Sequence, residues 1–445
     1  MSDMLSIGAS GVRAYQSALT TVSENIANAG TAGYTRRTAA LKEVVAVSGT
    51  SSASISGLGV TANGVTRAGD DIRAAEVRNA GSDLAKSETG ATWMGRIESA
   101  LTSSKPGDQL TAFFTSANAV AADPTALAPR AAMLEAATSV ATAFASTGNA
   151  LDAANMDLDA TADAAVSTLN SLAAGLAKIN TGLGRTQPGT AGAAALLDQR
   201  DALLEQMSAI TDVSVSVDTV GRATVRGGAN GPLLVKGDSA ATLTYVRGGE
   251  GAVSFAVHGD GETQPLAPNG GALAGVAEGA QRIAAARDKL DALATSFTSG
   301  LNAFQANGRD LNGAAGEPMF ATGSGPTDIT VTLSDPRGIA AASAGGGVRD
   351  NSNLTALAAL RKSGGYEGGI TDMVSTNAAA LAARQNVSDA QSAIRDSAVA
   401  ARDAGAGVNI DEEAVDLMRF QQAYQASSRV IQIARETLQS ILDIR

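Results

Sequence analysis

The stretch "SENIANAGTAGYTRR", residues 23–37, contains the point at which the first helical pattern of the chain stops. Upstream of it, apolar residues recur every seven positions, and a second set follows each of them by three. Asn and Gly readily adopt the left-handed backbone conformation that ends helices. The sequence therefore predicts an N-terminal helix with an apolar seam that ends between Asn28 and Gly33. The large side chains of this seam are Leu5, Val12, Tyr15, Leu19, Val22 and Ile26.

The last segment of the chain carries a matching pattern. It opens with "GVNIDEEAVDLMRF", residues 407–420, in which Asn409 can cap a helix with Glu412 three places on. Acidic residues crowd its first turns, where they favour the positive end of the helix dipole. A seven-residue spacing then defines a C-terminal seam, which consists of Leu417, Phe420, Tyr424, Ile431, Leu438 and Ile441. We predict that the two terminal helices pair, and that the molecule is elongated with both termini at one tip.

Between the two terminal segments, the pattern of apolar and polar residues changes several times. Residues 38–66 are predicted to be extended and to form a hairpin or an arm. Helix follows from about 70 to 210, interrupted at Pro106, Pro124 and Pro129. Apolar and polar residues alternate between about 212 and 268, which predicts antiparallel strands. Helix returns at about 273, a short strand lies in "TDITVTL", and a helical region interrupted by Gly is predicted from there to about 405.

These patterns predict a mainly α fold with an inserted small antiparallel β domain and nested, discontinuous domains. The terminal helices, paired as a coiled coil, form an inner domain from residues 1–36 plus 408–445. Residues 37–211 plus 269–407 form a helical middle domain with the extended arm. Residues 212–268 form the outer β domain.

The composition excludes several classes of protein. At 445 residues the chain is longer than one core usually holds, and we expect roughly two to four domains. Its formal net charge of -11 argues against nucleic-acid binding, because nucleic-acid phosphates are also negative. The absence of Cys excludes disulfides and thiolate metal sites. The apolar runs are too short to predict a membrane span, and "MSDMLSIGASGVRAY" lacks the pattern of a cleavable signal peptide.

Three features could carry chemistry, and a structural explanation is favoured for each. His258, the one His of the chain, lies at the end of a predicted strand without an identifiable catalytic partner. Glycine runs such as "GGANG" do not fit phosphate-binding spacings and are typical of hairpin turns. The acids at 411–416 could hold a metal ion, but acids are expected in a first helical turn. We therefore predict no catalytic residue, no metal site and no cofactor.

The two terminal seams have two explanations, an ordinary intramolecular core or packing between subunits of an assembly. Chain ends usually fray unless other residues hold them, and an isolated pair of such helices is marginally stable. Exposed apolar seams usually mark interaction sites. We therefore expect neighbouring copies to cover the seams, so that the seam residues of both helices form the assembly interface.

Two stretches resemble the proteins that form the axis of the bacterial flagellum. "NIANAGTAGYTRR" is similar to the N-terminal signature shared by flagellar rod, hook and hook-associated proteins, with Ala32 where that superfamily commonly has Pro. "GVNIDEEAVDLMRFQQAYQASSRVI" is similar to the C-terminal signature. The matching residues include Asn25, Asn28, Gly33, Tyr34 and Arg36 near the N-terminus, and Asn409, Gln421 and Gln422 near the C-terminus.

Two further stretches are similar to the family of hook-associated protein 1. The first is "LLDQRDALLEQMSAITDVSV", with Asp198, Arg200 and Asp201, and the second is "FTSGLNAFQANGRDLNGAAGEPMF", with Asn302 and Phe320. Members of that family often carry a further inserted domain. Since the chain is short for the family, this domain is expected to be reduced or absent.

The resemblance implies a structural subunit, not an enzyme, that forms the junction between hook and filament by self-assembly through its terminal helices. It implies an inner coiled-coil layer around a central channel, a second layer formed by the helical middle, and a β domain that faces outward. The implied partners are other copies of the chain, the hook protein, hook-associated protein 3 as the second junction protein, and an export chaperone at the C-terminal helix. The implied location is extracellular, in the flagellum, after type III export without signal cleavage.

Other assignments stay open at this point. Within the superfamily, the chain could be another axial protein, either the hook protein or hook-associated protein 3. Outside it, the alternatives are a secreted peptidoglycan-cleaving enzyme, which needs a carboxylate pair in a cleft, and a monomeric coiled-coil adhesin.

Overall fold

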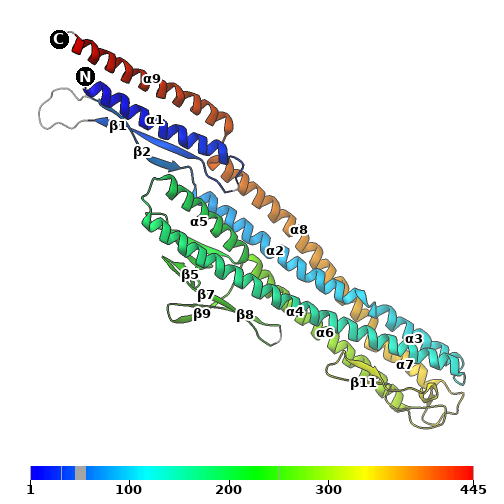
Figure 1. Ribbon diagram of the computed structural model, residues 1–445. Helices are drawn as coiled ribbons and strands as arrows, with labels where there is room; N and C mark the ends of the chain where they lie inside the picture. The colour runs from blue at the N-terminus through cyan, green and yellow to red at the C-terminus, as the bar shows by residue number, and fades with distance from the viewer. Residues whose placement is uncertain (1, 32, 46–56, 250, 444–445) are drawn as a thin grey trace.

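Stretches rich in Ala, with few aromatic side chains, form slim helices, and these give the molecule its length (Figure 1). The computed structural model describes residues 2–31, 33–45, 57–249 and 251–443. Helix α4 runs without a break over Leu127–Arg185, roughly 90 Å at 1.5 Å per residue. The two termini lie together at one end of an elongated body, which confirms the predicted shape.

The helices and strands follow the predicted order for most of the chain. The other helices are α1 (Ser2–Asn28), α2 (Asp71–Ser103), α3 (Pro106–Ala122), α5 (Ala191–Ile210), α6 (Gly271–Asn307), α7 (Ser352–Gly364), α8 (Tyr366–Ala406) and α9 (Ile410–Asp443). The strands of the β domain are β3 (Val213–Val217), β4 (Ala223–Gly227), β5 (Leu233–Lys236), β6 (Ser239–Ala240), β7 (Thr242–Arg247), β8 (Val253–Gly259) and β9 (Glu262–Leu266). The remaining short elements are β1 (Arg37–Val45), β2 (Gly57–Arg67), β10 (Gly308–Arg309), β11 (Phe320–Thr322), β12 (Ile329–Val331), the 3-10 helix η1 (Pro336–Gly338) and β13 (Ala342–Ser343).

Prolines mark most of the interruptions in the helical middle. Pro106 opens α3, and Pro124 lies in the turn before α4. Pro129, which the sequence predicts to be a break, instead lies in the first turn of α4. A backbone N–H has no helical acceptor there, so the proline ring costs the helix no hydrogen bond.

One continuous apolar core joins the helical middle to the β domain. Helix α2 packs against both α6 and α8, and α4 packs against α3, α5 and α6. The contact of α2 with α6 is close because Gly279 faces Trp93, the only Trp of the chain, which is 3% exposed. A Cβ at position 279 would lie 2.6 Å from Cγ of Trp93, so the glycine permits this approach.

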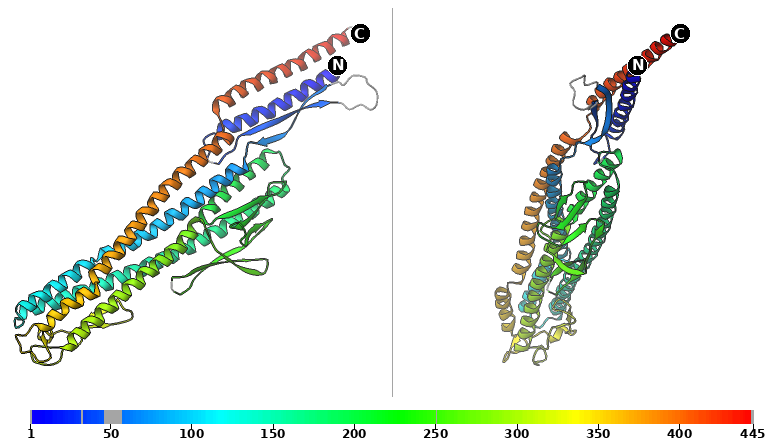
Figure 2. Two further views of the ribbon diagram at one scale, coloured as in Figure 1. Left: turned by 180° about the vertical axis from the view of Figure 1, so that it is seen from behind. Right: turned by 90° about the vertical axis from the view of Figure 1, so that its left-hand side faces the viewer.

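The alternating residues from 213 to 266 form two antiparallel sheets at one side of α4 (Figure 2). One sheet has the strand order β3-β4-β5-β6 and the other β7-β8-β9, which confirms the predicted small antiparallel sheets. Two amide side chains of α4 hold them. Asn170 exchanges two hydrogen bonds with the backbone of Leu243, and Asn180 does the same with Ala223. The β domain is thus fixed along α4.

The predicted helical region between the short strand and residue 405 is wrong in its first part. Residues 334–351 form turns, η1 and the short strand β13, which pairs with β10 from the preceding segment. Helix resumes only at Ser352. Pro336 and the glycines at 345–347 favour turns over helix. The buried guanidinium of Arg130 on α4 fixes this segment, since it donates to the carbonyls of Pro124 and Ile339 at 2.7 and 2.6 Å.

At the end that carries both termini, α1 and α9 pack side by side and antiparallel (Figure 1). The predicted extended arm is a hairpin of β1 and β2, whose residues 46–56 lie outside the described part of the chain. The hairpin packs on α1 and contributes Ala39 and Leu41 to a small apolar cluster that is separate from the main core. The division into residues 1–36 plus 408–445, 37–211 plus 269–407, and 212–268 stays a prediction.

We expect Gly279→Val to destabilise the helical middle, because the new side chain overlaps Trp93. Overpacking of this kind costs about 1–3 kcal/mol in the free energy of unfolding. Urea unfolding followed by the fluorescence of Trp93 measures the effect. The control is Gly95→Ala on α2, where a Cβ meets nothing within 4 Å, so this change should leave stability equal or slightly higher. Equal stability of Gly279→Val and the wild type would contradict the role given to Gly279.

Candidate functional site: the terminal helices and the joint at their base

The two terminal helices approach each other closely because small residues of α1 face larger residues of α9. A Cβ at Gly8 would lie 2.7 Å from Cγ1 of Ile431, and one at Gly11 would lie 2.5 Å from Oγ of Ser427. Further along the pair, Ala18 and Val22 of α1 are buried against Phe420 of α9. The helices therefore share a packed interface within one chain.

The structure divides the predicted interface residues by their exposure. Val22 and Phe420 are buried in the terminal apolar cluster, and Tyr15, Leu19, Ile26 and Leu417 are partly buried against it. Leu5, Val12, Tyr424 and Ile431 are half-buried outside that cluster. Leu438 and Ile441 stay 41% and 54% exposed. Whether these residues also contact neighbouring copies stays a proposal, taken up below.

Sequence reasoning missed a second set of apolar residues on α9. Val415, Met418 and Ile433 are 55–59% exposed and lie off the seven-residue columns of the seam, toward the opposite side of the helix. Leu442, at the C-terminal end, is 61% exposed. The available signal was the presence of large aliphatic side chains outside the seam, on a face that is otherwise polar.

At the base of the terminal helices, the side chain of Asn25 is completely buried and fully hydrogen-bonded. Its amide nitrogen donates to the carbonyl of Arg37 at 2.7 Å and to the carboxylate of Glu413 at 2.9 Å. Its amide oxygen accepts from the hydroxyl of Tyr34 at 2.9 Å and from the backbone N–H of Arg37 at 3.0 Å. Burial raises the pKa of Tyr34 in spite of the opposing charge of Arg37, so the hydroxyl stays protonated and donates.

Glu413, in the first turn of α9, is 1% exposed, and each of its two carboxylate oxygens accepts a hydrogen bond from another segment. One carboxylate oxygen accepts from Asn25, and the other accepts from Nε of Arg36 at 2.6 Å. This hydrogen bond is the main cause that raises the pKa of Arg36. Arg36 also lies 3.5 Å from Glu412 and 3.6 Å from Asp416. We call Asn25, Tyr34, Arg36 and Glu413 the latch, because they join the end of α1, the following turn and the start of α9.

A second polar layer connects the latch to the helical middle. Asp198 of α5 pairs with both Arg37, at 3.0 Å, and Arg67, at 2.7 Å. Arg67 also pairs with Asp201 at 2.6 Å. Burial by itself lowers the pKa of Arg67, but the charges of Asp201 and Asp198 outweigh it and leave the pKa raised. The joint between the terminal helices and the middle therefore includes a network of charge-assisted hydrogen bonds.

The remaining motif residues have other roles. Asn28 ends α1, and Gly33 follows in the turn with a φ of +77°. Asn409 accepts a hydrogen bond from the N–H of Asp411 and so caps α9, while Glu412 faces Arg36. Gln421 and Gln422 are exposed, and their side chains make no hydrogen bond with another described residue. Ala32 lies outside the described residues.

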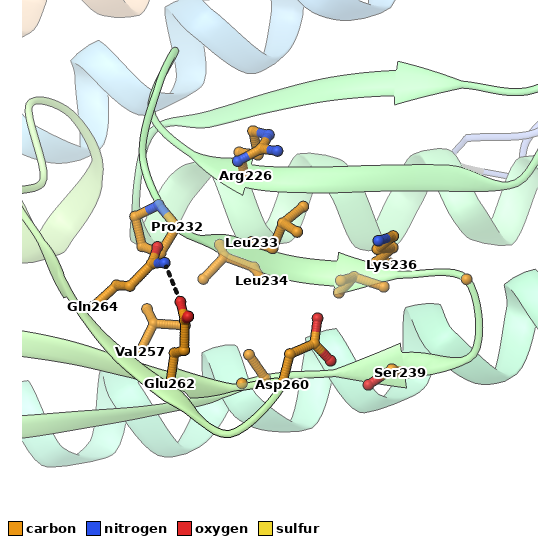
Figure 3. Close-up of a pocket in the computed structure, with 14 residues that line it drawn as sticks. Arg226, Pro232, Leu233, Leu234, Lys236, Ser239, Val257, Asp260, Glu262 and Gln264 are labelled. Carbon is orange, nitrogen blue, oxygen red and sulfur yellow. Dashed lines mark hydrogen bonds between the residues drawn. The ribbon is translucent and has the colours of Figure 1, made fainter.

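The β domain contains a groove of about 590 Å³ between β5 and the β8–β9 hairpin (Figure 3). Arg226 and Lys236 lie on the side of the first sheet, and Asp260 and Glu262 on the side of the hairpin. Both carboxylates are exposed, and Glu262 accepts a hydrogen bond from Gln264. His258 does not line the groove. Its two ring nitrogens are hydrogen-bonded to the hydroxyls of Thr244 and Thr263. The groove thus offers exposed charges but no buried acid or base.

Among the described residues, no helix is long and apolar enough to cross a membrane. No group of three or more acidic or His side chains within the described ranges is arranged to hold a metal ion.

We expect Asn25→Asp to loosen the terminal helices, because it replaces a donor by a negative charge that faces the carboxylate of Glu413. Leaving buried polar groups unpaired costs about 1–3 kcal/mol each. Hydrogen exchange of the amides of α1 and α9 should therefore become faster, while Trp93 fluorescence reports an unchanged middle. The control is Gln421→Ala, an exposed motif position on the same pair of helices, which should leave the exchange as it is. Unchanged protection in Asn25→Asp would show that the latch does not hold the helices.

Comparison with sequence families finds three flagellar matches in order along the chain. The model described as flagella basal body rod protein matches residues 5–35, and the one described as flagellar basal body rod FlgEFG protein C-terminal matches residues 402–444. Asn25, Tyr34 and Glu413 of the latch lie within these two matches. The model of the flagellar hook-associated protein FlgK helical domain matches residues 94–320, just over half of the chain.

Relatives named flagellar hook-associated protein 1 are similar to this chain. The relative from Salmonella typhimurium is 30% identical over 335 residues, which cover 73% of this chain and 60% of the relative. The one from Escherichia coli is 29% identical over 347 residues, with the same coverage. The one from Bacillus subtilis is 24% identical over 485 residues and covers 97% of this chain and 96% of the relative. The chain therefore spans 60% of the length of the Salmonella and Escherichia relatives.

A solved structure shares the fold over part of the chain. It is the flagellar hook junction protein FlgK from Burkholderia pseudomallei, with a TM-score of 0.50 and 24% identity over 56% of this chain and 47% of that one. This likeness agrees with the mainly α fold with inserted sheets that the sequence predicts. Because the helical-domain match covers more than half of the residues, this chain belongs to the flagellar hook-associated protein FlgK family.

Proposed function

We propose that the chain is a structural subunit of the bacterial flagellum that forms the junction between hook and filament by self-assembly through its terminal helices. The observation that carries the proposal is the exposed apolar surface of α9. Seven large aliphatic side chains stay 41–61% exposed there, namely Ile410, Val415, Met418, Ile433, Leu438, Ile441 and Leu442. Exposed large apolar side chains that gather on one element favour an interaction site there.

The energy of assembly follows from that surface. Burying a large aliphatic side chain contributes about 1.5–3 kcal/mol relative to leaving it in water. Within one chain, α1 already covers the seam side of α9, and Val415, Met418 and Ile433 lie on the opposite side of that helix. None of the described residues covers these side chains. In the proposed assembly a neighbouring molecule covers them, and the contact, repeated around a ring, makes a rigid joint.

The family supplies the partners in this proposal. The curated relatives are named hook-associated proteins, and the similar solved structure is named a hook junction protein. We propose the hook protein below the ring and hook-associated protein 3 above it. An export chaperone would cover the exposed residues of α9 before assembly, after which the chain leaves through the flagellar type III apparatus without signal cleavage and remains extracellular.

The elongated shape supports a layered arrangement. The terminal helices would pair as a coiled coil and form an inner layer around a channel, and the helical middle would form a second layer. The β domain stands out at one side of the helical body, which suits an outward position (Figure 2).

The proposed role is mechanical and not enzymatic. The relatives carry names of structural proteins, and the groove of the β domain holds exposed carboxylates, whereas peptidoglycan cleavage needs a carboxylic acid kept protonated in a cleft. Among axial proteins, the match to the FlgK helical domain favours hook-associated protein 1 over the hook protein or hook-associated protein 3. A monomeric adhesin would not need exposed apolar side chains on α9.

We expect Ile433→Glu and Met418→Glu to weaken self-assembly and incorporation at hook ends, because each places a charge in a surface that must be buried. A loss of about 2 kcal/mol per site corresponds to roughly a thirtyfold weaker association. Sedimentation at increasing protein concentration, and immunodetection on isolated hook–basal bodies, measure the two effects.

The matched control is Met156→Glu on α4, since Met156 is 68% exposed but lies in the helical middle. It should assemble as the wild type does, and all three variants should keep the Trp93 fluorescence and unfolding midpoint. Normal incorporation of both α9 variants would reject the proposed function.

A further inference from the structure

The groove between the two sheets of the β domain is held open by fixed contacts. The sheets approach each other closely at two places, and a glycine permits each approach. A Cβ at Gly259 of β8 would lie 2.9 Å from Cβ of Ala241, and one at Gly227 of β4 would overlap Cδ1 of Leu266. Because both contacts join packed backbone segments, the gap between the sheets exists before any ligand enters it.

Two rims of opposite charge face each other across this groove (Figure 3). Arg226 and Lys236 of the first sheet form the basic rim, and Asp260 and Glu262 of the β8–β9 hairpin form the acidic rim. Arg226 donates to the carbonyl of Gly231 within its own sheet, and Glu262 accepts from Gln264 within the hairpin. Among the described residues, no ion pair or hydrogen bond joins one rim to the other. Each rim therefore remains able to bind a group of opposite charge.

Between the rims the lining of the groove is aliphatic. Leu234 and Val257 are buried there, and Leu233 is half-buried. The volume of about 590 Å³ lies within the range of roughly 300–1,000 Å³ that is typical of small-molecule sites. A ligand that fits is therefore small, with an anion at one end, a cation at the other and apolar groups between them.

The edge of the second sheet disfavours a longer occupant. β9 is the edge strand of this sheet, and its residues Glu262 and Gln264 line the groove. A strand added to this edge would need backbone donors from β9, but Pro265 in the middle of β9 has no N–H. This favours a short ligand over an added strand.

We propose that the groove binds a short peptide with both ends free and aliphatic side chains. The ammonium group of the peptide lies at the acidic rim, its carboxylate lies at the basic rim, and its side chains cover Leu234 and Val257. An extended tripeptide spans about 10 Å, which is comparable to the spacing of roughly 10 Å between packed sheets. The groove lies in the β domain, away from the terminal helices, so this activity goes beyond the proposed assembly (Figure 1).

Isothermal titration calorimetry of the full chain at low ionic strength tests the site with three forms of one peptide. They are free Ala-Leu-Ala, its N-acetylated form, which lacks the cation, and its C-amidated form, which lacks the anion. We expect the free peptide to bind about fivefold more tightly than either capped form, because each cap removes one exposed ion pair. No saturable binding of the free peptide, or equal binding of all three forms, would overturn the proposal.

Two variants assign the ends of the peptide to the rims. Asp260→Asn with Glu262→Gln neutralises the acidic rim, and Asn tolerates the φ of +51° at position 260. Arg226→Gln with Lys236→Met neutralises the basic rim. In the acidic-rim variant, acetylation should change the affinity less than about twofold, whereas amidation should still weaken it about fivefold. The basic-rim variant should show the opposite. The same response of both variants to both caps would contradict the proposed orientation and reject the site.

The matched control is Asp238→Asn, an exposed acid in the turn after β5 that does not line the groove. It should bind the three peptides as the wild type does, and a loss equal to that of the acidic-rim variant would show a general charge effect instead of a site. All variants should keep the unfolding midpoint in urea. If one does not fold, the comparison of the three peptides on the wild type still decides the proposal.

Discussion

The buried carboxylate of Glu413 is the constraint on which the terminal end of the molecule depends. A charged group that is 1% exposed is costly unless donors satisfy it, and its two donors come from different segments, the amide of Asn25 and the guanidinium of Arg36. The start of α9, the end of α1 and the turn after α1 can therefore be well ordered only together. The same interaction sets the register of the two helices, which decides how much of α9 extends past α1.

This arrangement divides the molecule energetically. The helical middle and the β domain share one large apolar core, whereas the terminal helices and the hairpin share a small one around Ala18, Val22 and Phe420. Between them lie ion pairs of Arg37 and Arg67 with Asp198 and Asp201. The middle can thus remain folded when the terminal pair is loose, which is compatible with the proposed assembly through the terminal helices.

The structure also gives a physical role to many residues of the motifs shared with flagellar proteins. Asn25, Tyr34 and Arg36 belong to the latch, and Asp198 and Asp201 belong to the layer beneath it. Asn302 exchanges two hydrogen bonds with the backbone of Phe320 and closes the loop after α6. Most of these motif side chains join segments that are distant in sequence.

The local pattern of the sequence was sufficient to predict the terminal helices, the position of the small sheets and the elongated shape, because periodicity reports which side of each element must be covered. It was also sufficient to place Phe420 and Val22 on seams. It misplaced residues 334–351, where apolar content resembled helix but buried Arg130 and turn residues hold an irregular segment. Only the tertiary structure decided that Gly8 and Gly11 lie against Ile431 and Ser427. It also decided that the side chain of Asn25 is hydrogen-bonded to Glu413. The exposure of Val415, Met418 and Ile433 likewise follows from the tertiary structure. Those outcomes depend on contacts between residues hundreds of positions apart, and the spacing of residues along one helix contains no information about which neighbour covers it or where that neighbour ends.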